Sequence, residues 1–550
     1  MSNTSKISAI ALDRILGKLS TIHSLVKGFY LSSILFFLAI ILLPSILGIL
    51  IRVDTLSELS ENPQLFDRAI NAIIASFALA SFVSLLDLVT GIPLAWLIVK
   101  KGGRLVMILD AIVDLPMIIP TVTLGFSVLL FWSESNPFTS LGFSGISPGW
   151  LTVLLLHYTF SYPVVVRVLV GKLMEIDETY EIAGRTLGGK PLTVARTINI
   201  PLAKIGIITA YLLAFARSLS ETGATMMVAG LFENGPIFIK RALSEGWESP
   251  LVFTSLTLIS VAVIIFFLLR SLGPKVRIPF RRANPNFEGL LSKDSFCLFR
   301  DSISLLILTI FIVIPSIYLS LITLPNAINS GLILDVFQFG GVWGEYWNSL
   351  LISYVIGFIV TGINTVFSLP MAILIAREKF GSRISKILDV LSNVSIMIPS
   401  VALGVSIRFF WGGFTGLPEF WLIVMSHLCI TYPYMVSTMV SAIRDIPKEL
   451  EESARTLGSD PYTSFRKVTL PLAKYSFLSG MILTLARSVD ETGATLAVSK
   501  TVKTVPIIIV DWVKDESLRI YAGLGATFLL LFSLIILLLL RKLVGRGKYA

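Results

Sequence analysis

The segment Glu181-Ile-Ala-Gly-Arg-Thr-Leu-Gly188 occurs twice in this chain, the second time as Glu451-Glu-Ser-Ala-Arg-Thr-Leu-Gly458. Two further segments repeat with it. Ile198-Asn-Ile-Pro-Leu-Ala-Lys204 returns as Val468-Thr-Leu-Pro-Leu-Ala-Lys474, and Ala216-Arg-Ser-Leu-Ser-Glu-Thr-Gly-Ala-Thr225 returns as Ala486-Arg-Ser-Val-Asp-Glu-Thr-Gly-Ala-Thr495. Every second copy lies 270 residues after the first (188 to 458, 201 to 471, 221 to 491). The chain is therefore an internal duplication.

The duplication extends toward the N-terminus of each copy, with small changes in loop length. His157 and Tyr162-Pro163 match His427 and Tyr432-Pro433, and Ile119-Pro120 matches Ile398-Pro399. We predict a first repeat over residues 1–275, a linker over 276–298 and a second repeat over 299–550. The prolines at 120, 163, 399 and 433 are predicted to interrupt helices.

The composition is that of a membrane protein. Of 550 residues, 54% are hydrophobic and 15% are charged, and the mean hydropathy is +0.83. Residues 28–51 contain no charged side chain, and this run is long enough to cross a hydrocarbon core of about 30 Å. Because backbone polar groups in lipid must bond to one another, these runs should be helices. About twelve such spans are expected: 28–51, 70–99, 105–132, 150–173, 205–230, 250–269, 301–324, 350–376, 387–411, 421–443, 475–499 and 521–540.

The basic residues gather in alternate loops, whereas 133–149, 325–342 and 412–420 contain no Lys or Arg. Positive loops face the cytoplasm, so both termini are predicted to be cytoplasmic and the protein to be a multi-pass component of the cell (plasma or inner) membrane. The loop with Lys500, Lys503 and Lys514 fits this rule less well. With six spans per half, the repeats should run parallel. The net charge of +10 follows from this loop bias, so no nucleic-acid partner is expected.

The repeated loops resemble the EAA loop of binding-protein-dependent ABC import permeases, in which a Gly is followed by a hydrophobic residue and Pro. The match is closest to fused permeases of the ferric-iron and thiamine type, and the segments around 217–225 also resemble sulfate and molybdate permeases. Ile182 stands where the family usually has Glu, although Glu181 is adjacent.

This resemblance implies an all-α polytopic membrane protein, with two parallel six-helix repeats of the type I ABC importer permease. It implies coupling to a separate dimer of ATPase subunits, and an extracytoplasmic solute-binding protein as a further partner beside the lipid bilayer. The residues expected to couple to the ATPase are Glu181, Ala183, Gly188, Ile198 and Pro201 in the first loop, and Glu452, Ala454, Gly458, Val468 and Pro471 in the second.

We expect no enzyme activity in this chain. Gly17-Lys18 and Gly189-Lys190 lack the frame of a phosphate-binding loop, so ATP should be bound by a separate subunit and no cofactor by this one. Cys297 and Cys429 form no metal or disulfide pattern, and no metal site is expected.

Ionisable residues inside the predicted spans are the candidates for the pathway or its gate. Arg217 and Glu221 lie four residues apart, as do Arg487 and Glu491, and on one helix each pair would face each other. Asp490 adds a carboxyl where the first repeat has Ser220. These residues either shape passage or brace the helices, because an unpaired charge in a membrane is costly.

Two questions stay open at this point. A secondary transporter driven by an ion gradient would also have repeats and membrane carboxylates, but it would not need two matched cytoplasmic loops. The arginines would suit an oxyanion and the carboxylates a cation. Chain length and fusion favour ferric iron or thiamine as the substrate, with an oxyanion of the sulfate or molybdate type as the other possibility.

Overall fold

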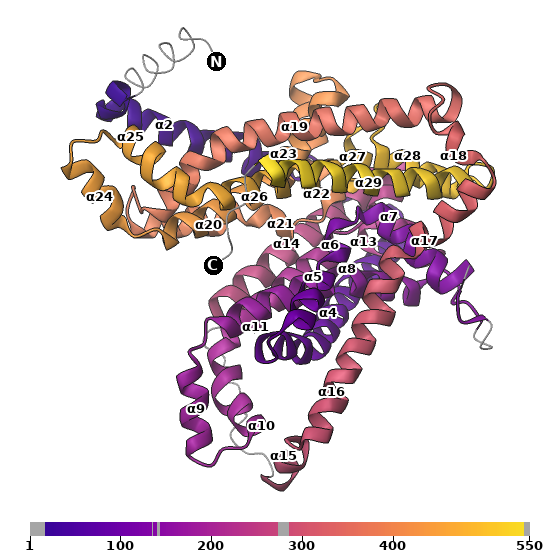
Figure 1. The fold of residues 1–550 in the computed structure, drawn as a ribbon. Coiled ribbons are helices and arrows are strands. Elements are labelled where there is room, and N and C mark those ends of the chain that lie inside the picture. Colours follow the sequence, from indigo (N-terminus) through magenta and orange to yellow (C-terminus); the bar gives the residue numbers. More distant parts are fainter. Residues whose placement is uncertain (1–16, 135, 140–143, 273–284, 544–550) are drawn as a thin grey trace.

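The computed structural model describes residues 17–134, 136–139, 144–272 and 285–543, which are helical and connected by loops, with no strand among them (Figure 1). The predicted linker 276–298 lies partly outside this range, and its residues from 285 onward form α15 and the start of α16. The basic residues Lys275, Arg277, Arg281 and Arg282 also lie outside the described residues.

The first half begins with a helical arm and ends with a long membrane helix. Its helices are α2 (His23–Phe36), α3 (Leu43–Leu50), α4 (Pro63–Lys100), α5 (Arg104–Val113), α6 (Leu115–Ile118), α7 (Thr121–Leu129), α8 (Trp150–Met174), α9 (Glu178–Thr186), α10 (Pro191–Val194), α11 (Ile200–Ser220), α12 (Gly223–Val228), α13 (Gly235–Glu245) and α14 (Glu248–Leu272).

The second half repeats this order. Its helices are α15 (Pro285–Leu291), α16 (Asp294–Ile307), α17 (Ile314–Asn329), α18 (Leu332–Asp335), α19 (Gly341–Ala376), α20 (Ser382–Ser392), α21 (Val394–Met397), α22 (Ser400–Thr415), α23 (Glu419–Asp445), α24 (Lys448–Thr456), α25 (Pro461–Ser464), α26 (Leu470–Val489), α27 (Gly493–Val498), α28 (Val505–Lys514) and α29 (Arg519–Leu543).

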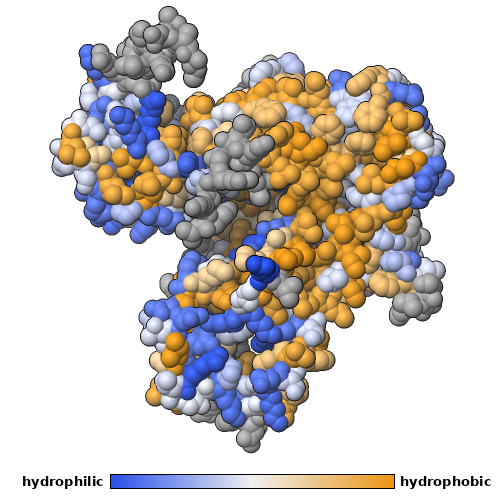
Figure 2. Space-filling view, in the orientation of Figure 1, coloured by the Kyte–Doolittle hydropathy of each residue, from blue (hydrophilic) through white to orange (hydrophobic). Residues whose placement is uncertain are grey.

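Among the described residues, ten helices are long and apolar enough to cross a membrane. The count rises to twelve only if each of two bent helix pairs is one span, namely 106–118 with 121–133, bent by 100°, and 382–397 with 400–413, bent by 105°. The expected spans 105–132 and 387–411 are therefore not straight helices. Apolar side chains dominate the middle of the visible face, and polar ones are concentrated at the two ends that carry α9 and α24 (Figures 1 and 2).

Proline explains the two bends. Ile119 and Ile398 are extended, with ψ of 128° and 126°, because a residue that precedes proline avoids the helical region. Pro120 and Pro399 then start α7 and α22 in a new direction. The prediction that proline interrupts a helix is therefore confirmed at Pro120 and Pro399. It is wrong for Pro163 and Pro433, which lie inside the continuous helices α8 and α23.

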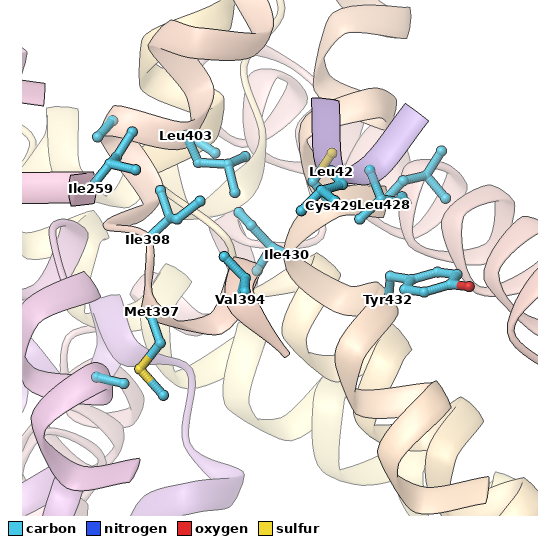
Figure 3. Packing of buried hydrophobic residues seen from close by; sticks show 14 of the residues in the cluster. Leu42, Ile259, Val394, Met397, Ile398, Leu403, Leu428, Cys429, Ile430 and Tyr432 are labelled. Carbon is cyan, nitrogen blue, oxygen red and sulfur yellow. The ribbon is translucent and has the colours of Figure 1, made fainter. Parts of the chain in front are cut away.

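The first helical arm of each half packs against the helices of the other half. The arm α2–α3 packs on α19, α22 and α23. The Ser33 hydroxyl donates to the Phe367 carbonyl at 2.5 Å, and the rings of Phe36 and Phe367 stack at 4.0 Å. Figure 3 shows Leu42 of this arm beside Leu428 and Cys429 of α23, within one buried apolar cluster.

The arm α16–α17 makes the equivalent exchange with α4, α7 and α8. Ser127 of α7 donates to the Pro315 carbonyl at 2.6 Å and accepts from the Leu319 N–H at 2.9 Å. Ser406 of α22 does the same with the Pro44 carbonyl (2.8 Å) and the Ile49 N–H (3.2 Å). One serine in each half thus holds the arm of the other half.

Candidate functional site

The repeated Arg-Ser-x-x-Glu-Thr-Gly segment interrupts a helix in each half. In the first half α11 ends at Ser220, Glu221 is extended with ψ of 129°, and α12 begins at Gly223. In the second half α26 ends at Val489 and α27 begins at Gly493. The expected spans 205–230 and 475–499 therefore each break near the residues that were predicted to form ion pairs.

The glutamates of this segment cap the helices that follow the break. A Glu221 carboxylate oxygen accepts from the Ala224 N–H at 3.2 Å, and Glu491 accepts from the Ala494 N–H at 3.0 Å. A carboxylate near a helix N-terminus satisfies an unpaired N–H and interacts favourably with the helix dipole. This local role keeps both carboxylates in place on a buried segment.

A histidine bridges each break. The two ring nitrogens of His157 lie 2.7 Å from the Ser218 hydroxyl and 2.9 Å from the Thr225 hydroxyl, so His157 of α8 joins α11 to α12. His427 lies 2.9 Å from both Ser488 and Thr495 in the same way. With both ring nitrogens bonded to hydroxyl groups, these histidines position the broken helices.

The helix breaks of one half contact those of the other. A Cβ on Gly223 would lie 2.7 Å from the Thr492 Cβ, and a Cβ on Gly493 would lie 2.9 Å from the Thr222 hydroxyl. The Ser400 hydroxyl at the start of α22 donates to the Ser220 carbonyl at 3.2 Å. Only glycine permits this approach of the two segments.

Asp490 makes the centre asymmetric. One of its carboxylate oxygens accepts from the Thr121 N–H at 2.6 Å and lies 3.2 Å from the Thr121 hydroxyl, at the start of α7. It therefore joins the break in α26–α27 to the bend of the opposite half. Ser220, its counterpart, contributes a backbone carbonyl instead. We name the region formed by Thr121, Ser220–Gly223, Ser400 and Asp490–Gly493 the central junction.

The two predicted ion pairs differ. Arg487 lies 2.7 Å from Glu491 and 3.8 Å from Asp490. Arg217 does not come within 4.0 Å of Glu221, although both residues are described; its guanidinium lies 5.3 Å from the centre of the Phe160 ring. The prediction that Arg217 and Glu221 face each other is therefore wrong. It assumed a helix that continues through Glu221, whereas α11 ends at Ser220; the second half is also interrupted before Glu491, but there Arg487 still reaches the carboxylate.

The central junction is closed to solvent. Thr222 and Thr492 are 1% and 2% exposed, and Glu221 and Glu491 are 4% and 1% exposed. A solute could cross this level only if the breaks of the two halves separated. Because the contacts are hydrogen bonds between helix ends, separation would need a rigid movement of the helices and no unfolding.

The first repeated loop is a short helix held against the membrane helices. Asp177 caps α9 by accepting from the Thr179 N–H at 2.9 Å. Glu181 accepts from Arg185 at 2.7 Å and from Asn199 at 3.2 Å, and lies 2.6 Å from the Lys100 ammonium. Burial opposes ionisation of Glu181, but the hydrogen bonds from Lys100 and Asn199 outweigh it and lower the pKa of this carboxyl.

The second loop repeats this arrangement with different side chains. Glu451 accepts from Arg377 at 2.7 Å and from the Thr469 hydroxyl at 2.9 Å. Gly188 and Gly458, which end α9 and α24, have φ of +85° and +90°, a conformation that favours glycine. The chain changes direction at these glycines; Pro201 and Pro471 lie later, in the first turns of α11 and α26.

The predicted coupling residues divide into an inner and an outer set. Glu181 is buried and Ile198, Pro201, Ala454 and Val468 are partly buried, whereas Ala183, Gly188, Glu452, Gly458 and Pro471 are exposed. Ile182 and Glu452, where the two loops differ, both face outward, and Glu181 and Glu451 face inward. The inner acid is therefore common to the loops and the outer one is not.

Two leucines complete the outer surface, and neither is among the predicted coupling residues. Leu187 is 89% exposed and Leu457 is 88% exposed, each at the tip of its loop. Both stand immediately before the glycine that ends the repeated segment, and that matched position is a signal by which they could have been found.

No group of three or more His, Cys, Asp or Glu side chains within the described part of the chain could hold a metal ion. Cys429 is buried in α23, and its thiol donates to the Ile40 carbonyl at 3.2 Å.

Sequence comparison identifies relatives of both halves. The family described as "Binding-protein-dependent transport system inner membrane component" matches residues 87–278 and again 368–548. A molybdate/tungstate transport system permease protein of Pyrococcus furiosus is 30% identical over 190 residues, which are 34% of this chain and 75% of the relative. Its counterpart in Methanocaldococcus jannaschii is 30% identical over 248 residues, 42% of this chain and 93% of the relative. A molybdenum transport system permease protein of Mycobacterium bovis is 34% identical over 162 residues, 29% of this chain and 61% of the relative.

Proposed function

The chain belongs to the family of binding-protein-dependent transport system inner membrane components, and from this we propose that it forms the complete translocation pathway of an ATP-driven importer for an oxyanion of the molybdate or tungstate kind. The observation that carries the proposal is that the family match occurs twice, over 87–278 and 368–548. Two permease halves in one polypeptide make both sides of one pathway.

The oxyanion assignment rests on the relatives, whose names state molybdate, tungstate or molybdenum transport. It replaces ferric iron or thiamine as the favoured substrate. The central junction does not favour an anion by charge, because two arginines stand beside three carboxylates. Selection of the solute therefore falls to an external binding protein, and the junction serves as the gate.

The two loops supply the coupling. In this proposal α9 and α24, with Leu187 and Leu457 at their tips, dock on two ATPase subunits in the cytoplasm, and the termini share that side. Closure of the ATPase dimer would move α9 and α24 together. Because Glu181 binds Lys100 of α4 and Glu451 binds Arg377 beside α19, that movement reaches the long membrane helices directly.

The test is uptake by proteoliposomes that contain this chain with its ATPase subunits and binding protein. We expect uptake of labelled molybdate and tungstate that needs ATP and persists when ionophores abolish ion gradients. A Gly188→Val/Gly458→Val double variant is the matched control, since valine strains both loop turns and should uncouple hydrolysis from uptake. Uptake that needs an ion gradient and no ATPase would contradict the proposal in favour of a secondary transporter. Uptake of thiamine or ferric iron, without molybdate uptake, would contradict the substrate only.

A further inference from the structure

A cavity of about 800 Å³ opens between the N-terminal arm and the second coupling loop. Its walls are apolar on two sides. Leu25, Val26 and Phe29 of α2 form one wall, and Leu369 and Ile373 of α19 form the other. Figure 1 shows α2 beside α25 at the end of the molecule that carries α24. Because α2 belongs to the candidate membrane span His23–Glu61, the cavity lies at the cytoplasmic end of that span in the orientation that we propose.

The polar end of this cavity has an excess of positive charge. Arg377, Lys379, Lys448 and Arg455 line it, against the two carboxylates Glu451 and Glu452. The Arg377 guanidinium already has partners, because it donates to Glu451 at 2.7 Å and to the Ile446 carbonyl at 3.1 Å.

The other three cations have no such partner. Within the described part of the chain, no carboxylate lies within 4.0 Å of a side-chain nitrogen of Lys379, Lys448 or Arg455. Burial lowers the pKa of the Lys379 ammonium and the nearby Arg455 lowers it further, and together they outweigh the opposite effect of Glu451. A cation that is partly buried beside other cations is a site that an anion would stabilise.

The first half shows what the same place looks like without this excess. By the repeat, Lys448 corresponds to Glu178 and Arg455 to Arg185. Lys100 lies 2.6 Å from Glu181 and 3.8 Å from Glu178, and Arg185 lies 2.7 Å from Glu181, so each cation there has a carboxylate.

The equivalent space in the first half is also closed. It measures about 10 Å³ and is lined by Trp96, whose counterpart in the second half is Ile373. Among the residues that the structure describes, the large cavity and the unpaired cations therefore occur together, in the second half and not at the equivalent place in the first. General permease architecture does not require them, since the first half does without both.

We propose that this cavity binds an anionic phospholipid of the membrane. The phosphate lies among Lys379, Lys448 and Arg455, and the acyl chains lie along α2 and α19. A ligand for this site must combine an anionic head with long apolar chains, and it must be available at the bilayer surface; anionic phospholipids meet all three conditions. The bound lipid joins the arm of the first half to the coupling loop of the second. This site goes beyond the proposed function and does not depend on the transported solute.

The test uses the full chain purified in detergent, with native mass spectrometry and thermal unfolding in the presence of phosphatidylglycerol, phosphatidylcholine or inorganic phosphate. We expect retention of phosphatidylglycerol in preference to phosphatidylcholine by roughly tenfold or more, and little effect of inorganic phosphate. Lys448→Glu, which installs the first-half residue, should abolish the preference. Ile373→Trp, which installs the first-half wall, should exclude the lipid without changing any charge.

Lys467→Glu is the matched control, because Lys467 is an exposed cation of the same loop region that does not line the cavity. This variant should keep the preference for phosphatidylglycerol. Equal retention of the two lipids by the unmodified chain would overturn the proposal, and so would full retention by both Lys448→Glu and Ile373→Trp. Stabilisation by inorganic phosphate equal to that by the lipid would show a free-anion site instead. If one variant does not give folded protein, the other still decides the question.

Discussion

At the level of single residues, Arg217 and Arg487 occupy equivalent positions in the repeat but have different partners. Arg487 binds Glu491 at 2.7 Å, and Arg217 lies over the Phe160 ring. The duplication has therefore kept the residues and changed their contacts. A comparison of the two pairs within one molecule can separate the effect of an ion pair from the effect of the charges themselves.

We predict that Arg487→Leu lowers the yield of folded protein, because it leaves the buried Glu491 carboxylate without its cation. Breaking a buried pair costs about 3–5 kcal/mol. The double change Arg487→Leu/Glu491→Gln should recover most of the yield, measured by size-exclusion chromatography of a fluorescent fusion. Arg217→Leu with Glu221→Gln is the internal control and should show no such recovery. Equal recovery in both halves would contradict the assigned pairing.

A second residue-scale prediction concerns Asp490, which holds the Thr121 N–H across the central junction at 2.6 Å. A hydrogen bond to a charged group contributes about 1.5–3 kcal/mol. Asp490→Ser should therefore weaken the closed arrangement and raise ATP hydrolysis in the absence of the binding protein, by roughly tenfold. Ser220→Asp at the equivalent position should not do so. Unchanged basal hydrolysis in Asp490→Ser would mean that this contact does not restrain the gate.

At the level of elements, each repeated loop presents a leucine that is almost fully exposed, Leu187 at 89% and Leu457 at 88%. We predict that Leu187→Asp and Leu457→Asp each weaken binding of the ATPase, since a buried leucine contributes about 1.5–3 kcal/mol and an introduced charge adds a desolvation cost. The measurement is copurification of the ATPase with the tagged chain, followed by uptake. Thr197→Asp, which places the same charge on an exposed position away from the tips, should bind normally. Normal copurification by a Leu187→Asp/Leu457→Asp double variant would exclude the leucines from the interface.

The sequence predicted the elements that depend on local pattern. The helical membrane fold, the duplication and the two glycine-terminated loops follow from composition and repeated motifs. The break at Glu221 was not predicted, because the four-residue spacing of Arg217 and Glu221 is typical of a continuous helix when each copy is taken alone. One copy taken alone also could not show the contact made at the break, where a Cβ on Gly223 would lie 2.7 Å from the Thr492 Cβ of the other half. The exchange of arms was also missed, since an apolar helix does not encode which bundle it joins.

At the level of the whole molecule, the orientation in the membrane is open to a direct test. In a background with Cys297 and Cys429 replaced, a cysteine at Lys190 or at Ser459 should react with an impermeant reagent only from the cytoplasmic side. A cysteine at Asn329, at the end of α17, should react only from outside. Right-side-out and inverted vesicles give the comparison. The opposite pattern would reverse the orientation that we propose.

The exchanged arms also bear on how the chain is made. Ile49 and Ser406, which hold α3 to α22, are 357 residues apart. During synthesis the first arm therefore cannot pack against α22 until most of the chain has been translated. Its contacts with the second half are among the last to form. The second arm meets helices that already exist when it emerges. A ribosome-stalled product that ends at residue 272 should therefore leave α2 and α3 accessible to lipid and to crosslinking, although they are the first helices to enter the membrane.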